Sequence, residues 1–265
     1  MSAWREVAPA KLTWRLAVGE RRPDGYHELE AEMVSLDLAD ELLITEPGEG
    51  IELIAEPWAR ADGLLLGDEN LISRALELCG RQASVTLTKR VPLGGGLGGG
   101  SSDAAAVLRW AGLTDLQAAA TLGGDVPFCL AGGRALVRGI GEQVEPLEHL
   151  ARTVVLVLPP FGIDTGAAYR ALDELRLHGR GHDERNDLTA AAASLSPQLG
   201  RFKAALGALT GATPVLAGSG STLFVEGTKV SLGLAGMDEL VVDGLTARVL
   251  EASTIPADTG GAMVP

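Results

Sequence analysis

The chain has 265 residues, 46% of them hydrophobic and 22% charged, which is ordinary for a globular protein that forms one large core or two smaller ones. Two compact lobes are expected, residues 1–150 and 151–265. The formal net charge of -13 argues against a nucleic-acid partner, because affinity for a phosphate backbone comes from clustered Lys and Arg. A single phosphorylated metabolite is not excluded, since backbone N–H groups and a few cations suffice to bind it.

The cysteine content and the hydropathy pattern limit the cellular compartment in which the protein is expected. Cys79 and Cys129 are the only cysteines, too few for the disulfide framework of a secreted protein. No apolar run approaches 18 residues, and the first residues lack the basic segment and apolar core of an export signal. We therefore expect a cytoplasmic protein without a membrane partner, present as a monomer or weak homodimer.

The first half of the chain is predicted to open with strands and to continue with helices. Residues 5–58 alternate short apolar runs with turns, and Asp24-Gly25 predicts a tight turn directly before Tyr26 and His27. Apolar spacing predicts a helix over 70–79 and a strand over 84–89. An Ala-rich helix is expected over 103–111, capped by Ser101 or Ser102, and a capping box at 114–117 predicts a second helix ending at 123–124.

The second half alternates strands and helices. Residues 153–158 form an apolar run before two prolines, which predicts a buried strand. Helices are predicted over 166–175 and 197–209, with strands over 213–216, 221–226 and 248–252. Between them, His178 and His182 have a spacing that binds metal on a helix. Glycines at 179 and 181 disfavour a helix there, so residues 176–185 are predicted to be a solvated loop.

The most informative feature is the glycine-rich loop, residues 92–102, in which six of the seven residues 94–100 are glycine. Glycine lets backbone N–H groups approach phosphate oxygens, and a helix that follows adds the positive end of its dipole. No Lys precedes Ser101, so this is not a Walker loop, and its mid-chain position does not suit a Rossmann fingerprint. The predicted nucleotide-binding residues are Pro92, Gly94, Gly95, Gly96, Leu97, Gly98, Gly99, Gly100, Ser101 and Ser102.

The loop resembles the central motif of the GHMP kinase superfamily, which includes galactokinase, homoserine kinase, mevalonate kinase and phosphomevalonate kinase. The likeness extends from Pro9 to about Phe224, and it is greatest to the branch that phosphorylates a cytidine-diphosphate-linked methylerythritol. Further matching motifs occur in the family's order. They are Pro9-Ala10-Lys11-Leu12, Asp24-Gly25-Tyr26-His27, Gly124-Asp125-Val126-Pro127, Asn186-Asp187-Leu188 and Gly218-Ser219-Gly220.

The resemblance implies that Asp125 is the catalytic carboxylate and that Lys11 is the cation beside it. Phosphoryl transfer to an alcohol needs an oriented hydroxyl, a proton acceptor and neutralised phosphate charge. Taken without the resemblance, Asp125 is typical of a helix N-cap and Lys11 of a solvated strand lysine. Ser101 and Ser102 fit either helix caps or contacts with phosphate and Mg²⁺, and we expect Ser102 to be the metal contact.

The resemblance also implies the substrate residues. Tyr26 and Tyr169 stand where the family places two aromatic rings around a cytosine, and His27 would hydrogen-bond to its edge; alone, a Tyr-His pair after a turn is typical of an exposed surface. Residues Gly218, Ser219 and Gly220 would close on the site, and Thr165 would either line it or cap a helix. Thr13 replaces the Asn that follows Pro-Ala-Lys-Leu in the family, so the contact of this side chain with the substrate is expected to differ.

The expected protein is therefore α+β with the two-lobed GHMP kinase fold, an N-terminal lobe like domain 2 of ribosomal protein S5 and a ferredoxin-like C-terminal lobe. The expected reaction uses ATP with Mg²⁺ to phosphorylate the 2-hydroxyl of a 4-diphosphocytidyl alcohol in non-mevalonate isoprenoid synthesis. Two alternatives remain: the same chemistry on homoserine, mevalonate or a sugar, and a nucleotide-binding homologue without turnover.

Overall fold

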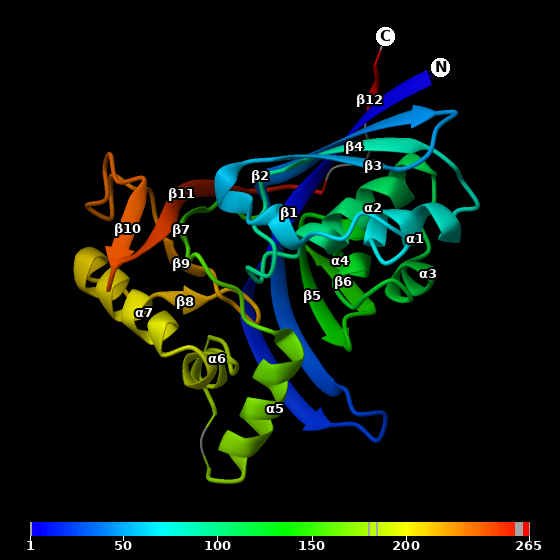
Figure 1. Ribbon diagram of the computed structural model, residues 1–265. Helices are drawn as coiled ribbons and strands as arrows, with labels where there is room; N and C mark the ends of the chain where they lie inside the picture. The colour runs from blue at the N-terminus through cyan, green and yellow to red at the C-terminus, as the bar shows by residue number, and fades with distance from the viewer. Residues whose placement is uncertain (1, 180, 184, 258–261, 265) are drawn as a thin grey trace.

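The structure is a computed structural model that describes residues 2–179, 181–183, 185–257 and 262–264. Its strands join in a mixed sheet whose main path runs β12-β1-β2-β11-β7-β9-β8, so it passes through both halves of the molecule (Figure 1). The strands are β1 (Ser2–Arg21), β2 (His27–Glu46), β3 (Ile51–Ala55), β4 (Ser84–Lys89), β5 (Arg134–Gly139), β6 (Gln143–Leu147), β7 (Thr153–Leu158), β8 (Val215–Leu216), β9 (Leu223–Glu226), β10 (Glu239–Val242), β11 (Leu245–Ile255) and β12 (Ala262–Val264).

The helices divide between the two ends of this sheet. Helices α1 to α4 lie beside β4 and β5, whereas α6 and α7 lie beside β8 and β10, and α5 lies next to the turn end of the β1–β2 hairpin (Figure 1). They are α1 (Leu71–Leu78), α2 (Gly99–Trp110), α3 (Leu116–Ala120), α4 (Val126–Ala131), α5 (Thr165–Arg176), α6 (Thr189–Leu195) and α7 (Pro197–Thr210), with 3-10 turns at Pro57–Ala59 and Ala61–Gly63. Within the described residues, no helix is long and apolar enough to cross a membrane.

Helix α2 lies at the centre of the N-terminal core because its side chains are small. Residues 104–108 are completely buried, and three of these five are alanine, which lets the helix lie close to β1. Around it pack larger apolar side chains from the sheet and from α4, including Leu42, Ile44, Val85 and Phe128. The glycine-rich loop leads directly into this helix, so the loop stands on a closely packed support.

Most predicted elements are confirmed, with corrections at their ends. Helix α2 begins at Gly99, so Ser101 and Ser102 lie in its first turn and cap nothing; its N-cap is Gly98, which has φ +67. Helix α3 is capped by Asp115, whose side chain accepts from two backbone N–H groups, and it ends at Ala120, before residues 123–124. Strand β8 is only two residues long, and β11 extends to Ile255, beyond the predicted 248–252.

Candidate active site

The candidate site is a cleft made of two adjoining cavities. The first has a volume of about 290 Å³ and is lined mainly by the glycine-rich loop, by Lys11 and by the 218–220 loop. The second has a volume of about 550 Å³ and is lined by the end of the β1–β2 hairpin and by α5. Asp125, Ser101, Thr165 and Tyr169 line both cavities, so they mark the place where the two meet.

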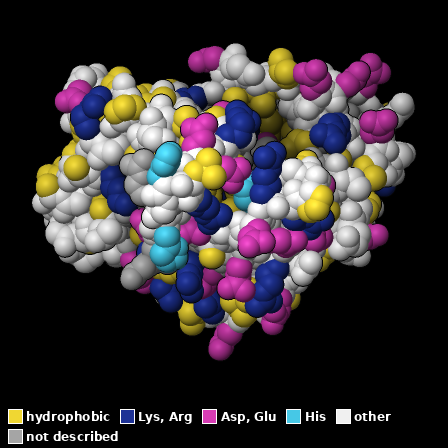
Figure 2. Space-filling view, turned by 90° about the horizontal axis from the view of Figure 1, so that it is seen from below, with side chains coloured by type: hydrophobic (Ala, Val, Ile, Leu, Met, Phe, Trp, Pro, Cys, Tyr) yellow, Lys and Arg dark blue, Asp and Glu magenta, His cyan; other side chains and the backbone are white. Residues whose placement is uncertain are grey.

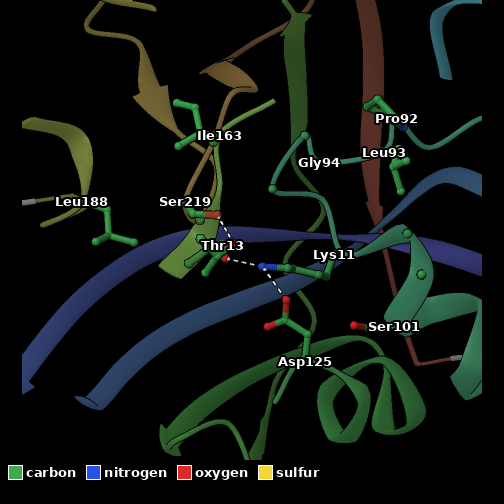
Figure 3. Close-up of a pocket in the computed structure, with 18 of the residues that line it drawn as sticks. Lys11, Thr13, Pro92, Leu93, Gly94, Ser101, Asp125, Ile163, Leu188 and Ser219 are labelled. Atoms are coloured by element: carbon green, nitrogen blue, oxygen red, sulfur yellow. Dashed lines mark hydrogen bonds and ion pairs between the residues drawn. The ribbon is translucent and has the colours of Figure 1, made fainter. Parts of the chain in front are cut away.

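The predicted pair of Lys11 and Asp125 is brought together at this junction. Lys11 Nζ lies 3.1 Å from Asp125 Oδ2 and donates to Thr13 Oγ1 at 3.2 Å (Figure 3). The Lys11 side chain is only 6% exposed, whereas Asp125 is 36% exposed and faces the cleft. Asp125 does occupy the N-cap position of α4, yet its side chain makes no capping hydrogen bond. The carboxylate thus pairs with Lys11 instead of capping the helix, and it is accessible to a ligand.

Irregular pairing of β1 with β2 aims Lys11 into the cleft. The register of the two strands shifts between Pro9 and Lys11 and again between Thr13 and Arg15. Such bulges bend a strand and re-aim side chains, and they are frequent beside active sites. The backbone N–H of Lys11 donates to the carbonyl of Leu97 at 2.9 Å, which ties the strand to the glycine-rich loop.

The glycine-rich loop requires glycine at three positions, because the backbone there adopts the left-handed conformation. Gly94, Gly96 and Gly98 have φ of +64, +78 and +67. A Cβ on Gly98 would also stand 2.6 Å from Lys11 Cγ, so the loop and the lysine pack together only because this side chain is missing. The loop residues 92–96, Gly98–Gly100 and Ser101 line the first cavity, whereas the Leu97 side chain is completely buried.

The start of helix α2 presents backbone N–H groups at the end of this loop. The first N–H groups of a helix have no intrahelical partner, and the dipole places partial positive charge there. Ser101 lines both cavities (Figure 3). Ser102 differs from the expectation: it is completely buried, and its hydroxyl donates to the carbonyl of Pro9 at 2.6 Å. Helix α2 starts at Gly99, four residues before the predicted 103, so both serines lie in its first turn; Ser101 lines the cavities and Ser102 faces β1.

A buried ion triad that the sequence did not reveal lies below the start of α2. Lys89 Nζ donates to Asp40 at 2.5 Å and to Asp103 at 2.7 Å, and all three residues are at most 3% exposed. Burial lowers the pKa of Lys89, but attraction to Asp103 and Asp40 outweighs it and leaves the pKa above its usual value. The ammonium lies 3.0 Å from where a Cβ of Gly99 would stand. The two carboxylates balance the ammonium, so the triad acts as a buried polar support that fixes Lys89 under the first turn of α2.

The predicted substrate residues gather around the second cavity. The rings of His27 and Tyr169 stack with centroids 5.2 Å apart and an interplanar angle of 26°. Tyr26 lines the same cavity and is 62% exposed, while its backbone N–H donates to Asp24. Burial, with the nearby charge of Asp125, raises the pKa of Tyr169 to about 12, so its hydroxyl stays protonated. The two tyrosines thus flank one cavity.

The 218–220 loop is fastened from two sides. Asn186, which belongs to a predicted motif, donates from its buried amide to the carbonyls of Leu216 and Gly218 at 2.8 and 2.7 Å. On the exposed side, Ser219 and Thr165 share a hydrogen bond of 2.9 Å (Figure 3). Thr165 is the first residue of α5, and Asp164 rather than Thr165 caps that helix. The loop and α5 therefore meet above the cleft.

Three contributions to the site were missed by sequence reasoning. They are the triad of Lys89, Asp40 and Asp103, the amide of Asn186 that fastens the 218–220 loop, and Asp173, which contacts His27. Only one signal for the triad was present in the sequence: Lys89 lies in a predicted strand with buried apolar residues, and Asp103 lies in an Ala-rich helix, so both charges were placed among buried neighbours. The described part of 176–185 has His178 and His182 exposed, and in the described residues no cluster of three potential metal ligands occurs.

Charge is mixed on the face that the molecule presents from below. Lys and Arg side chains are interspersed with Asp and Glu over this face (Figure 2). Around the second cavity, Arg21 and Arg170 supply positive charge close to Asp125 and Asp173. The cations available to a ligand are therefore a few placed side chains, as the sequence analysis expected for a small phosphorylated molecule.

Comparisons with known proteins identify relatives along the whole chain. Residues 70–133 match the family described as GHMP kinases N terminal domain. The 4-diphosphocytidyl-2-C-methyl-D-erythritol kinase of Paracoccus denitrificans is 41% identical over 237 residues, which cover 83% of this chain and 85% of that protein. The enzyme of the same name from Carboxydothermus hydrogenoformans is 36% identical over 254 residues, covering 82% and 86%.

Solved structures agree with these relatives. A crystal structure of 4-(cytidine 5'-diphospho)-2C-methyl-D-erythritol kinase matches with a TM-score of 0.70 and 32% identity, over 94% of this chain and 98% of that one. Homoserine kinase from Cytophaga hutchinsonii matches with a TM-score of 0.60 over 99% of this chain and 97% of that one. Its identity is 18%, so that likeness concerns the fold alone.

Proposed function

Because this chain belongs to the 4-diphosphocytidyl-2-C-methyl-D-erythritol kinase family, we propose that it transfers the γ-phosphoryl group of ATP to the 2-hydroxyl of that cytidyl alcohol, in isoprenoid biosynthesis. Its fold is the GHMP kinase fold expected from the sequence. One observation carries the proposal: the Lys11–Asp125 pair stands where a glycine-lined cavity meets a second, aromatic-lined cavity. A donor and an acceptor placed in the two cavities would meet at this pair.

Asp125 acts on the acceptor in the proposed mechanism. Its carboxylate accepts the proton of the acceptor hydroxyl while the hydroxyl oxygen forms a bond to the γ-phosphorus. The bond between that phosphorus and the β–γ bridging oxygen breaks, and ADP leaves. Lys11 stabilises the negative charge that develops on the oxygens, and the hydroxyl of Thr13 holds the ammonium in place by accepting from it.

The glycine-rich loop and the first turn of α2 bind the triphosphate in this proposal. Their N–H groups donate to phosphate oxygens, and Lys89, whose charge is balanced by Asp40 and Asp103, supports the first turn of the helix from below. The donor set also fits Mg²⁺, which takes few protein ligands and keeps waters and substrate phosphates in its shell. The hydroxyl of Ser101 would hold it, with phosphate oxygens and waters as the other ligands, and the ion would neutralise charge on the transferred phosphoryl group.

The second cavity is proposed to take the cytidyl group. Tyr26 and Tyr169 offer ring faces on which a base stacks, and His27 offers a ring nitrogen at the base edge. Arg21 and Arg170 line the same cavity and would neutralise the diphosphate. We also propose residues 1–150 and 151–265 as the two lobes, a cytoplasmic location in keeping with two free cysteines, and a monomer or weak homodimer.

The test is an assay of ATP consumption by the purified protein, with the product identified by mass spectrometry. A phosphorylated product is expected with 4-diphosphocytidyl-2-C-methyl-D-erythritol and not with homoserine, mevalonate or galactose at equal concentration. Turnover of one of the control alcohols at a comparable rate would assign the same chemistry to another substrate. Binding of ATP without any turnover would overturn the proposal in favour of a non-catalytic homologue.

A further inference from the structure

Asp173 is a carboxylate in the second cavity to which the proposed mechanism gives no task. It lies on α5 four residues after Tyr169, which places both side chains on the same face of the helix. Its Oδ1 lies 2.7 Å from Nε2 of His27, the first residue of β2. The contact thus joins the hairpin to α5 across the cavity. The imidazole is 5% exposed and Asp173 is 33% exposed, so the ring is buried against its partner.

Two contacts fix this imidazole. The ring of Tyr169 stacks on it and sets its plane. The carboxylate of Asp173 only accepts hydrogen bonds when ionised, so Nε2 must be the nitrogen that carries the proton. In the neutral ring, Nδ1 is then an acceptor. Among the described residues, no protein group hydrogen-bonds to Nδ1, which leaves its lone pair for a ligand.

We propose that Asp173 is a specificity-determining positioning residue, which holds His27 as the Nε2–H tautomer so that Nδ1 accepts from a base carrying an exocyclic amino group. Cytosine presents such an N4 amino donor, whereas a base with an oxo group at the same place presents an acceptor. An oxo group facing the Nδ1 lone pair leaves both acceptors unpaired in a partly buried site. The inference rests on the proposed function, because it takes the ligand of this cavity to be a cytidyl group.

The kinetic test compares 4-diphosphocytidyl-2-C-methyl-D-erythritol with its uridyl counterpart, using wild-type protein and Asp173→Asn. Asparagine keeps the size of the side chain, but its amide can either accept from or donate to Nε2, so the tautomer is no longer fixed. KM for the cytidyl substrate is expected to rise about 3- to 10-fold, the worth of one neutral hydrogen bond between the base and Nδ1. The preference for cytidyl over uridyl substrate should fall by a similar factor, while KM for ATP stays the same.

Glu174→Gln is the matched control. It removes one negative charge from the neighbouring, exposed position of α5 and should leave every constant unchanged. An Asp173→Asn variant that keeps the cytidyl KM and the base preference would overturn the inference. So would a fall of kcat that is equal for both substrates, which indicates a purely structural role.

A spectroscopic readout is independent of turnover. Long-range ¹H–¹⁵N spectra of ¹⁵N-labelled protein distinguish the protonated from the unprotonated ring nitrogen, and His27→Gln identifies the signals of this residue among the four histidines. At a pH where the ring is neutral, wild-type His27 should show a protonated Nε2 and an unprotonated Nδ1, and Asp173→Asn should show a mixture. An Nδ1–H tautomer in the wild type, or no change in the variant, refutes the inference. Lack of turnover on the cytidyl substrate refutes the proposed function instead.

Discussion

Gly96 lies against the backbone of Ala217 and Gly220, so Gly96→Ala tests whether this close contact shapes the site. A Cβ there would stand 2.9 Å from the amide nitrogen of Gly220 and closer still to the carbonyl oxygen of Ala217. Ordinary contacts between carbon and oxygen are about 3.3 Å or longer, so the loops must separate by roughly 1 Å. The left-handed φ of +78 adds a second cost.

The two costs give the expected magnitude. A non-glycine residue in the left-handed region costs about 1–2 kcal/mol, and relief of an overpacked contact costs about 1–3 kcal/mol. Gly96→Ala should therefore lower the free energy of unfolding by about 2–5 kcal/mol. A shift of the loop by roughly 1 Å should also lower kcat/KM by about 100-fold, because reacting groups tolerate little misplacement.

Gly112→Ala is the matched control, because Gly112 has φ +77 and nothing lies within 4 Å of the added Cβ. It carries only the backbone cost of about 1–2 kcal/mol, and it should retain full activity. Unfolding midpoints in urea and steady-state kinetics measure both variants. Equal losses of stability and equal activity in the two variants would refute the claim that contact between the loops shapes the site.

The remaining predictions concern single side chains. Asp125→Asn should lower kcat about 10²- to 10⁴-fold while calorimetric titration still detects ATP binding; unchanged turnover would exclude a general base here. Burial, opposed by Lys89 and assisted by Asp40, raises the pKa of Asp103 to about 7, above the 3.8 of a free carboxyl. The native state then binds the proton more tightly, so the free energy of unfolding should fall between about pH 4 and pH 7. Urea midpoints should show a flatter profile in Asp103→Asn, and identical profiles would contradict the pKa shift. Asn186→Ala leaves two buried carbonyls without a hydrogen-bond donor, so it should lower the free energy of unfolding by about 2–4 kcal/mol and also lower kcat. A variant as stable as the wild type would show that the 218–220 loop does not depend on these hydrogen bonds.

Features with a local cause were predictable from the sequence. The turn at Asp24-Gly25 and the helix of 71–78 follow from short-range patterns, as does the place of the glycine-rich loop directly before a helix. Ser102 was expected to contact the metal and instead faces β1, because the helix begins inside the glycine run, four residues before the predicted 103. Ser101 and Ser102 therefore lie in the first turn, where neighbouring residues point about 100° apart around the helix axis.

Features that join distant parts of the chain were not predictable from residue types alone. Lys11 and Asp125 are 114 positions apart, and only the resemblance to a family placed them together. Asp40, Lys89 and Asp103 come from β2, β4 and α2, and each taken alone is typical of a solvated charge. Asp173 faces His27 because α5 packs across the hairpin, a consequence of tertiary structure that no local pattern encodes.

The continuity of the sheet has a mechanical consequence. Strand β2 pairs with β11 through Leu36–Thr254 and Ser35–Ile255, and Leu16 bridges to Asn186, so the two halves share hydrogen-bonded backbone instead of a linker. A body joined in this way resists swinging about a hinge. The 218–220 loop is fastened to Asn186 and Thr165, and His27 joins the hairpin to Asp173 of α5, so the walls of the cleft share the stiffness of the sheet. A cleft whose walls are held in this way has its shape before a substrate enters, and less conformational entropy is lost on binding.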